Sequence, residues 1–167
     1  MRKILCAILV LIGSNSIIIG QETASMKIYY SQAIEFIKGN SMVGKPNENY
    51  SKIRVSNQLI PFDVLGWFYQ NELSQKISGG YIPTDNFKKI DYKINDTISN
   101  FSSCKKKCKF LIFFSEFKNG FLLAEVLKDS SSSDYLTATM FGQTTVFLFE
   151  YSGENLKNVL NKKVNHN

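Results

Sequence analysis

The chain has 167 residues, carries a formal net charge of +6 and is 44% hydrophobic, and 13% of its residues are aromatic. This apolar content excludes a wholly disordered chain, and the length suits one domain with a single sizeable core. His166 is the only histidine. Catalytic arrangements that need a histidine therefore depend on a residue at the C-terminus, where chains tend to fray.

Residues 1–20 have the pattern of a secretory signal peptide. Two basic residues precede an unbroken apolar run over 4–12, and small and polar residues follow at 13–16. These polar residues come too early for a membrane span, which needs about 20 apolar residues. We therefore predict an exported protein, periplasmic or secreted, from which 1–20 is removed and in which 21–167 forms one α+β domain.

The alternatives to this interpretation concern the cut and the anchor. We favour cleavage after Gly20, and cleavage after Ser16 is the alternative that places small residues at the recognition positions. A lipoprotein would need a cysteine directly after the apolar run, whereas Cys6 lies inside it. Anchoring by an uncleaved apolar N-terminus stays open.

Removal of 1–20 lowers the net charge from +6 to +4 and leaves seventeen lysines and one arginine, Arg54. Because sequence-specific recognition of nucleic acid relies on the planar guanidinium group, this composition argues against a nucleic-acid partner. Lysines gather at 88–89, around 105–109 and at 162–163. If these clusters converge on one surface, they favour an anionic partner; scattered solubility charges are the alternative.

Cys104 and Cys108 are the two cysteines outside the predicted signal peptide. An even pair in an exported protein predicts a disulfide, and the lysines between the two residues favour the thiolate that oxidation requires. Free thiols are one alternative. A zinc site is the other, and it needs two further ligands from a chain with one histidine. We expect no metal and no cofactor.

The first two thirds of the domain predict mainly helices. Apolar residues recur with helical spacing over 26–37, and Gly39-Asn40 is a stop signal. In chain order, the expected elements are a helix over 26–37, a loop over 40–50, a strand over 52–59, a helix over 64–77, an edge strand over 87–94 and a helical turn over 95–101.

The last third predicts an antiparallel meander. Asn119 and Gly120 join two apolar runs, and Asn-Gly is the strongest short hairpin signal because both residues tolerate positive φ. The expected strands cover 110–117, 121–128, 135–151 and 156–164, with a serine-rich loop over 129–134. The predicted fold is α+β, with N-terminal helices packed on one face of a curved meander of four or more strands. This architecture resembles the cystatin-like and nuclear-transport-factor-2-like cones.

Two carboxylates on the predicted hairpin are the candidate catalytic residues. If Asn119 and Gly120 form a two-residue turn in register, Glu116 and Glu125 lie diagonally on one face. They could then line a pocket for acid–base chemistry or cation binding, and a solvated end of the sheet is the alternative. The same register assigns Phe110, Ile112, Phe114, Leu123 and Leu127 to their face. Leu122, Ala124 and Val126 then form a core face, on which Ile37 is expected to pack.

No G-x-S-x-G nucleophile elbow and no glycine-rich phosphate loop occurs in the chain. The leading hypothesis is an exported protein of the bacterial envelope that binds a ligand or a protein without catalysis. One alternative is a small hydrolase or isomerase that uses Glu116 and Glu125. Another is an inhibitor of a secreted enzyme that acts through the loop 129–134. No motif indicates the ligand, the partner or the oligomeric state.

Overall fold

The computed structural model describes residues 26–39, 52–82, 91–104, 108–128, 132, 134–140 and 142–166. The predicted signal peptide, the loop expected over 40–50 and most of the loop 129–134 lie outside the described residues. So do the lysines at 88–89 and 105–107.

The described elements follow one another along the chain as helices and strands in mixed order. They are a helix over 26–39, β1 (Ile53–Ile60), α2 (Phe62–Gly66), the 3-10 helix η2 (Trp67–Tyr69), α3 (Gln70–Lys76), β2 (Lys93–Ile94), α4 (Asp96–Ser99), β3 (Phe110–Ser115), β4 (Phe121–Lys128), α5 (Tyr135–Thr139), β5 (Gln143–Ser152) and β6 (Asn155–Asn165).

All six strands form one sheet in the order β2-β1-β3-β4-β5-β6. Strands β3 to β6 are the antiparallel meander that the sequence predicts. Strand β1 pairs with β3 in parallel, and a parallel pair needs a long crossover connection. The segment from α2 to α4 is that connection. The α+β class and the mostly antiparallel sheet are thus confirmed.

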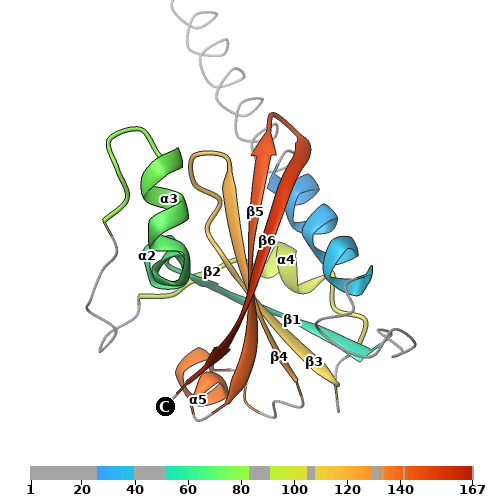
Figure 1. Ribbon diagram of the computed structural model, residues 1–167. Helices are drawn as coiled ribbons and strands as arrows, with labels where there is room; N and C mark the ends of the chain where they lie inside the picture. Colours follow the sequence, from blue (N-terminus) through green and yellow to red (C-terminus); the bar gives the residue numbers. More distant parts are fainter. Residues whose placement is uncertain are drawn as a thin grey trace, which may run out of the picture.

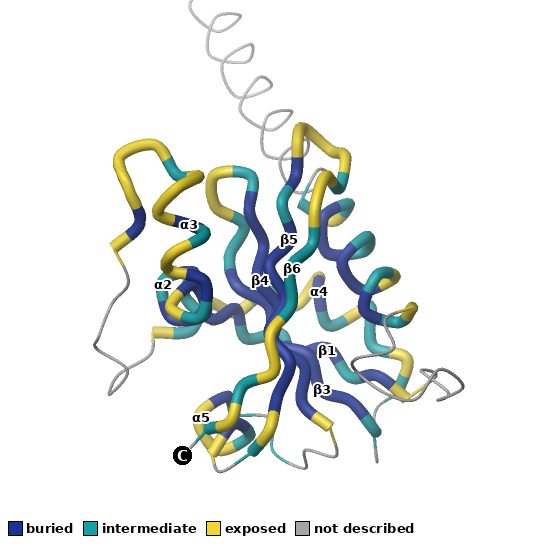
Figure 2. Tube along the Cα trace, in the orientation of Figure 1, coloured by how far each residue is buried: buried dark blue, intermediate teal, exposed yellow. Residues whose placement is uncertain are grey.

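Helices cover both faces of the sheet (Figure 1). The helix over 26–39 and α4 pack on one face, and α2, η2, α3 and α5 pack on the other. We call the two sets of buried side chains the 26–39 cluster and the α2–α3 cluster. Figure 2 shows the consequence, since β3 and β4 in the middle of the sheet are buried along almost their whole length.

The expectation of helices on one face is therefore wrong. Strand β3 has the sequence FLIFFS, with large apolar side chains at five successive positions. Successive side chains of a strand point to opposite faces, so a strand of this kind is apolar on both faces and both need cover. The prediction for Ile37 is confirmed: this side chain is fully buried and lies in the 26–39 cluster with Leu122, Ala124 and Val126.

The strand expected over 135–151 is shorter than predicted. It begins at Gln143 and is preceded by α5. The Asp134 carboxylate accepts a hydrogen bond from the Thr137 backbone N–H at 3.0 Å and caps this short helix. Aspartate is a preferred residue directly before a helix. The interpretation of 129–134 as a loop did not take this helix start signal into account. The helix expected over 64–77 is present as three short segments, α2, η2 and α3.

The β3–β4 hairpin has the predicted turn and an unpredicted register. Asn119 and Gly120 have φ values of +53° and +81°, and Lys118 pairs with Phe121. Further along the hairpin, however, Phe114 pairs with Ala124 and not with Glu125. One extra residue is thus accommodated between the turn and the ladder, a β-bulge. The Ser115 hydroxyl fills the gap by accepting the Leu123 N–H at 2.9 Å.

The bulge exchanges the two faces of β3 relative to β4. Glu125, Leu123 and Leu127 therefore share a face with Leu111 and Phe113. The predicted grouping of Glu125 with Phe110, Ile112 and Phe114 is wrong, because a one-residue shift in register moves every side chain to the other face. Among the described helices, none combines the length and the apolar character that a membrane crossing requires.

Candidate functional site

Glu125 lies in the core of the domain, with a relative exposure of 0%. Its two carboxyl oxygens accept hydrogen bonds from neighbouring hydroxyl groups. The Tyr135 hydroxyl donates to Oε2 at 2.7 Å, and the Thr144 hydroxyl donates to Oε1 at 2.5 Å. His166 Nε2 lies 2.7 Å from Oε1 and 3.2 Å from the Thr144 hydroxyl oxygen. In the tautomer with its hydrogen on Nε2, His166 is a third donor to the same carboxyl group.

These four side chains come from four parts of the fold. Glu125 lies on β4 and Thr144 on the neighbouring strand β5. Tyr135 is the first residue of α5, and His166 follows β6. The backbone N–H of His166 donates to the Gly142 carbonyl at 2.9 Å, which fixes the end of the chain beside Thr144. The cluster thus joins the last strand and α5 to the centre of the sheet.

The surroundings of Glu125 favour an anchoring role. Burial and the nearby charge of Glu125 raise the pKa of Tyr135 well above its ordinary value, so Tyr135 stays a hydrogen-bond donor. A group that performs acid–base catalysis must reach the substrate. Glu125 is fully buried and its oxygens are already occupied by donors of the protein, whereas His166 keeps 20% of its side chain exposed.

Glu116, the second candidate, has different neighbours. It follows the end of β3 and forms an ion pair with Lys93 on β2, with 35% of its own side chain exposed. Burial, and then the charge of Glu116, raise the pKa of Tyr30, a member of the 26–39 cluster. The structure therefore does not bring Glu116 and Glu125 together into the shared pocket that the predicted register implied.

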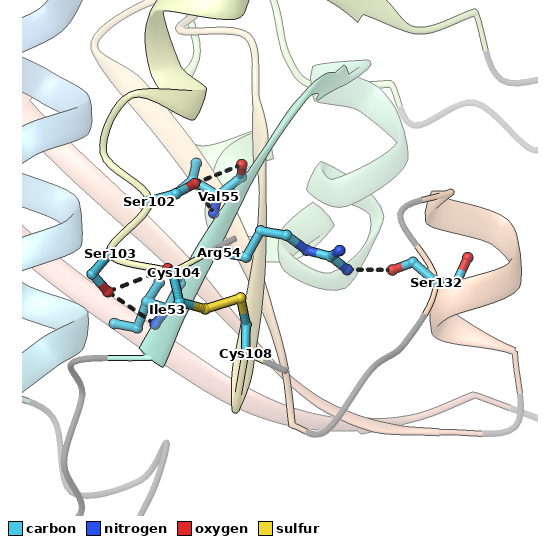
Figure 3. Close-up of a disulfide and its surroundings, with 8 residues drawn as sticks. All are labelled: Ile53, Arg54, Val55, Ser102, Ser103, Cys104, Cys108 and Ser132. Carbon is cyan, nitrogen blue, oxygen red and sulfur yellow. Dashed lines mark hydrogen bonds between the residues drawn. A yellow bond between two sulfur atoms is a disulfide. The ribbon is translucent and has the colours of Figure 1, made fainter. Parts of the chain in front are cut away.

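The sulfur atoms of Cys104 and Cys108 lie at disulfide-bonding distance, and their Cα atoms are 5.9 Å apart. Figure 3 shows this pair beside β1. The backbone N–H groups of Ser103 and Cys104 donate to the Ile53 carbonyl, at 2.8 and 3.2 Å. The Ser102 hydroxyl accepts the Val55 N–H at 2.8 Å. The residues that lead to the pair, 102–104, are thus held against the start of β1.

Within the described residues no metal site is assembled, and the convergence of the three lysine clusters stays a prediction. Among these described residues, no group of three or more His, Cys, Asp or Glu side chains is placed to hold a metal ion. Of the three lysine clusters, only 162–163 is described in full. Arg54, the single arginine outside 1–20, donates to the Ser132 carbonyl at 2.8 Å beside the cysteine pair, as Figure 3 shows.

One edge of the sheet is formed by β6. This strand has eleven residues and is the last in the strand order, so β5 is its only partner among the described strands. Among the described residues, no backbone hydrogen bond joins Asn155–Asn165 to a segment other than β5. Figure 1 looks onto this edge, which lies between α3 and the helix over 26–39. Figure 2 shows that it is exposed or half-buried along its whole length.

Both faces of β6 carry half-buried apolar side chains. Leu156 and Val159 pack against the 26–39 cluster, and Leu160 and Val164 pack against the α2–α3 cluster. Each is covered by the core on one side and partly accessible on the other. At the edge strand, the apolar side chains on both faces therefore remain partly accessible to solvent.

The charges on β6 are all positive, because the strand has three lysines and no acidic residue. Lys162 pairs with Glu72 at 2.7 Å and lies over the Tyr69 ring, 4.5 Å from its centroid. Burial raises the pKa of Glu72, but the hydrogen bond and charge of Lys162 outweigh it and the pKa is lowered. The charge of Lys162 is thus already engaged by side chains of the same domain.

The other two lysines of β6, Lys157 and Lys163, are less engaged by carboxylates of the domain. Lys157 lies 3.5 Å from Glu150, a carboxylate that also pairs with Lys76. The hydrogen bond from Lys76 is the main reason that the pKa of Glu150 is lowered. Lys163 is exposed, and no ion pair to it is formed within the described part of the chain. The edge therefore carries positive charge that the neighbouring carboxylates do not fully offset.

Comparison with protein families, with curated proteins and with solved structures finds no significant match to this chain.

Sequence reasoning named Glu125 and missed its partners. The position of His166 near the C-terminus disfavours a functional role on sequence grounds, although β6 carries it to Glu125, 41 residues away in sequence. The edge of β6 was also missed, because the order of strands in a sheet depends on pairing between distant segments. The run of lysines and asparagines in 155–165 was the available signal, since lysine is typical of exposed edges.

Proposed function

We propose that this chain is an exported bacterial envelope protein that binds a partner protein without catalysing a reaction. The observation that carries the proposal is β6, an eleven-residue edge strand without a neighbour among the described residues on its outer side. Edge strands of this kind accept extended peptides by β-augmentation, in which main-chain hydrogen bonds supply affinity. The proposal does not depend on the cone architecture, which stays a prediction from the order of elements.

Export is supported by two independent features. The signal-peptide pattern over 1–20 predicts it, and a cysteine pair at bonding distance suits an oxidising compartment. The test is mass spectrometry of protein from the cell exterior, alkylated without reduction. We expect a chain that begins at Gln21 and carries no alkylated cysteine. Recovery of the intact chain from the cytoplasm with alkylated Cys104 and Cys108 would contradict export.

The enzymatic alternative has one observation in its favour, the close approach of Glu125 and the partly exposed His166. A small hydrolase or isomerase could use such a pair as acid and base. The binding function is preferred because Glu125 is enclosed and Glu116 is engaged elsewhere. The inhibitor alternative concerns the loop 129–134, most of which lies outside the described residues.

Binding is tested by native mass spectrometry of envelope fractions after gentle capture of the mature protein. A stoichiometric complex is expected, and its formation should be reduced by charge reversal on β6 and not on the opposite edge strand β2. A complex that ignores β6, or turnover that is lost in His166→Ala with the fold intact, would contradict the proposal.

A further inference from the structure

We propose that β6 pairs with an extended, acidic segment of a partner protein, which adds a seventh strand to the sheet. This inference rests on the binding function proposed above and names the chemistry of the partner. It is carried by the backbone of β6, by the apolar side chains on its two faces and by its charge.

The backbone supplies the first requirement. In a strand, the N–H and C=O groups of alternate residues point to opposite edges. Pairing with β5 uses those on the inner side of β6, from Asn155 to Asn165. The outer groups form no backbone hydrogen bond to another described segment. An incoming strand that runs along β6 would find a row of donors and acceptors in regular spacing.

The side chains supply the second requirement. Val159 and Leu160 stand at the middle of β6 on opposite faces, and each is partly exposed at the end of its core cluster. A partner strand with apolar residues at its centre would bury the exposed parts of both. Removal of this apolar surface from water would stabilise the complex.

Charge identifies the ends of the partner segment. Lys157 and Lys163 lie on either side of the apolar centre, and β6 has no carboxylate of its own. A strand with acidic residues flanking an apolar centre would face these lysines. The same charges disfavour a second copy of the chain, since a two-fold antiparallel pairing centred on Leu160 would place Lys157 opposite Lys163 of the other copy.

The test uses a defined probe on the mature protein. The peptide Asp-Glu-Thr-Val-Thr-Val-Thr-Val-Asp-Glu, blocked at both ends and labelled with a fluorophore, is titrated with protein and followed by anisotropy. We expect saturable binding that weakens as salt is raised. The matched peptide with Lys and Arg in place of Asp and Glu should bind at least tenfold more weakly. Equal binding of the two peptides, or no binding of the acidic one, would overturn the inference.

Backbone pairing is separated from charge attraction by N-methylation. Methyl groups on the three Thr nitrogens block one edge of the peptide, and methyl groups on the three Val nitrogens block the other. Strand addition predicts that one of these two peptides loses binding at least tenfold and the other keeps it. If both methylated peptides bind like the parent, the contact is electrostatic only and strand addition is wrong.

Two variants locate the site. Lys157→Glu with Lys163→Glu should weaken binding of the acidic peptide at least tenfold. The control is Lys52→Glu with Lys93→Glu, which makes the same change of net charge directly before β1 and on β2. This control should change the affinity for the acidic peptide by less than threefold. Equal losses of affinity in the two double variants would contradict the placement of the site on β6. If the peptide fails while a native envelope complex forms and is weakened by the β6 variant, pairing with an acidic strand is wrong and binding through β6 stands. If no complex forms, or if it forms regardless of the β6 variant, both fail.

Discussion

At Glu125, hydroxyl groups from α5 and β5 and the ring of His166 surround one buried carboxyl group. Buried polar groups of this kind are tolerated only when they are hydrogen-bonded, and loss of the carboxyl group leaves the surrounding hydroxyls without this acceptor. The same amino acid at Glu116 is partly exposed and forms a single ion pair with Lys93. The two glutamates therefore allow a comparison of one functional group in two environments.

We predict that Glu125→Ala lowers the free energy of unfolding by about 2–4 kcal/mol, because the Tyr135 and Thr144 hydroxyls lose their carboxylate acceptor and a cavity is left. Glu116→Ala should change it by less than about 1 kcal/mol, as expected for an exposed ion pair. Urea denaturation of both variants provides the comparison. A small effect at Glu125, equal to that at Glu116, would show that the buried cluster does not hold α5 and the chain end to the sheet.

At the scale of elements, the helix over 26–39 closes one face of the sheet through Ile37. Ile37→Asp would bury an unpaired carboxylate in the 26–39 cluster and should cost at least about 3 kcal/mol. Lys38→Asp, one position along the helix, removes an ion pair with Glu35 and adds a like charge, so it should cost less than about 1 kcal/mol. Thermal melts of the two variants decide this, and equal small shifts would mean that the helix is peripheral.

Gly66 is the point where α2 meets the segment after α3. A Cβ atom added there would lie 2.7 Å from Cζ of Tyr81, a ring that is itself held by a hydrogen bond from its hydroxyl to the Asp63 carbonyl. Gly39, at the end of the helix over 26–39, has open space around the same position.

Glycine to alanine in a helix normally stabilises by about 1 kcal/mol. We therefore expect Gly39→Ala to leave the melting temperature unchanged or slightly raised. Gly66→Ala should lower it by several degrees, because the ring of Tyr81 has to move. Calorimetry of the two variants measures the difference, and a melting temperature that rises in both would show that Tyr81 adapts without loss.

Local patterns could predict the elements but not their pairing. The helix over 26–39 and the turn at Asn119-Gly120 follow from spacing and from residue types that lie next to one another in the chain. The parallel β1–β3 pair depends on contacts more than fifty residues apart, for which the sequence has no local signal. The bulge at Ser115 depends on one side-chain hydrogen bond to Leu123, and it was enough to invert the faces assigned to Glu125.

At the scale of the whole molecule, buried tyrosines couple the fold to alkaline pH. Burial is the main cause that raises the pKa of tyrosine hydroxyls above their ordinary value near 10, at the half-buried Tyr92 and at five buried tyrosines. They are Tyr30, Tyr69, Tyr81, Tyr135 and Tyr151. In the unfolded chain these groups lose their protons at lower pH than in the folded protein.

The stability that these tyrosines contribute is fully present below pH 10 and is lost as the pH rises through their folded pKa values. Each contributes a slope of about 1.4 kcal/mol per pH unit in that range. We predict cooperative unfolding above pH 10, in which tyrosinate absorbance and loss of circular dichroism coincide. Gradual appearance of tyrosinate with unchanged circular dichroism would contradict this.

The central claim is that β6 is a binding edge, and amide hydrogen exchange resolved by residue tests it most directly. In the free protein, we predict that amides of alternate residues over 155–165 exchange fast, because they face outward, while those bonded to β5 are protected. Addition of the acidic peptide should protect the fast set and leave β2, at the other edge, unchanged. Protection that appears elsewhere in the sheet, or an edge already protected in the free protein, would contradict the account.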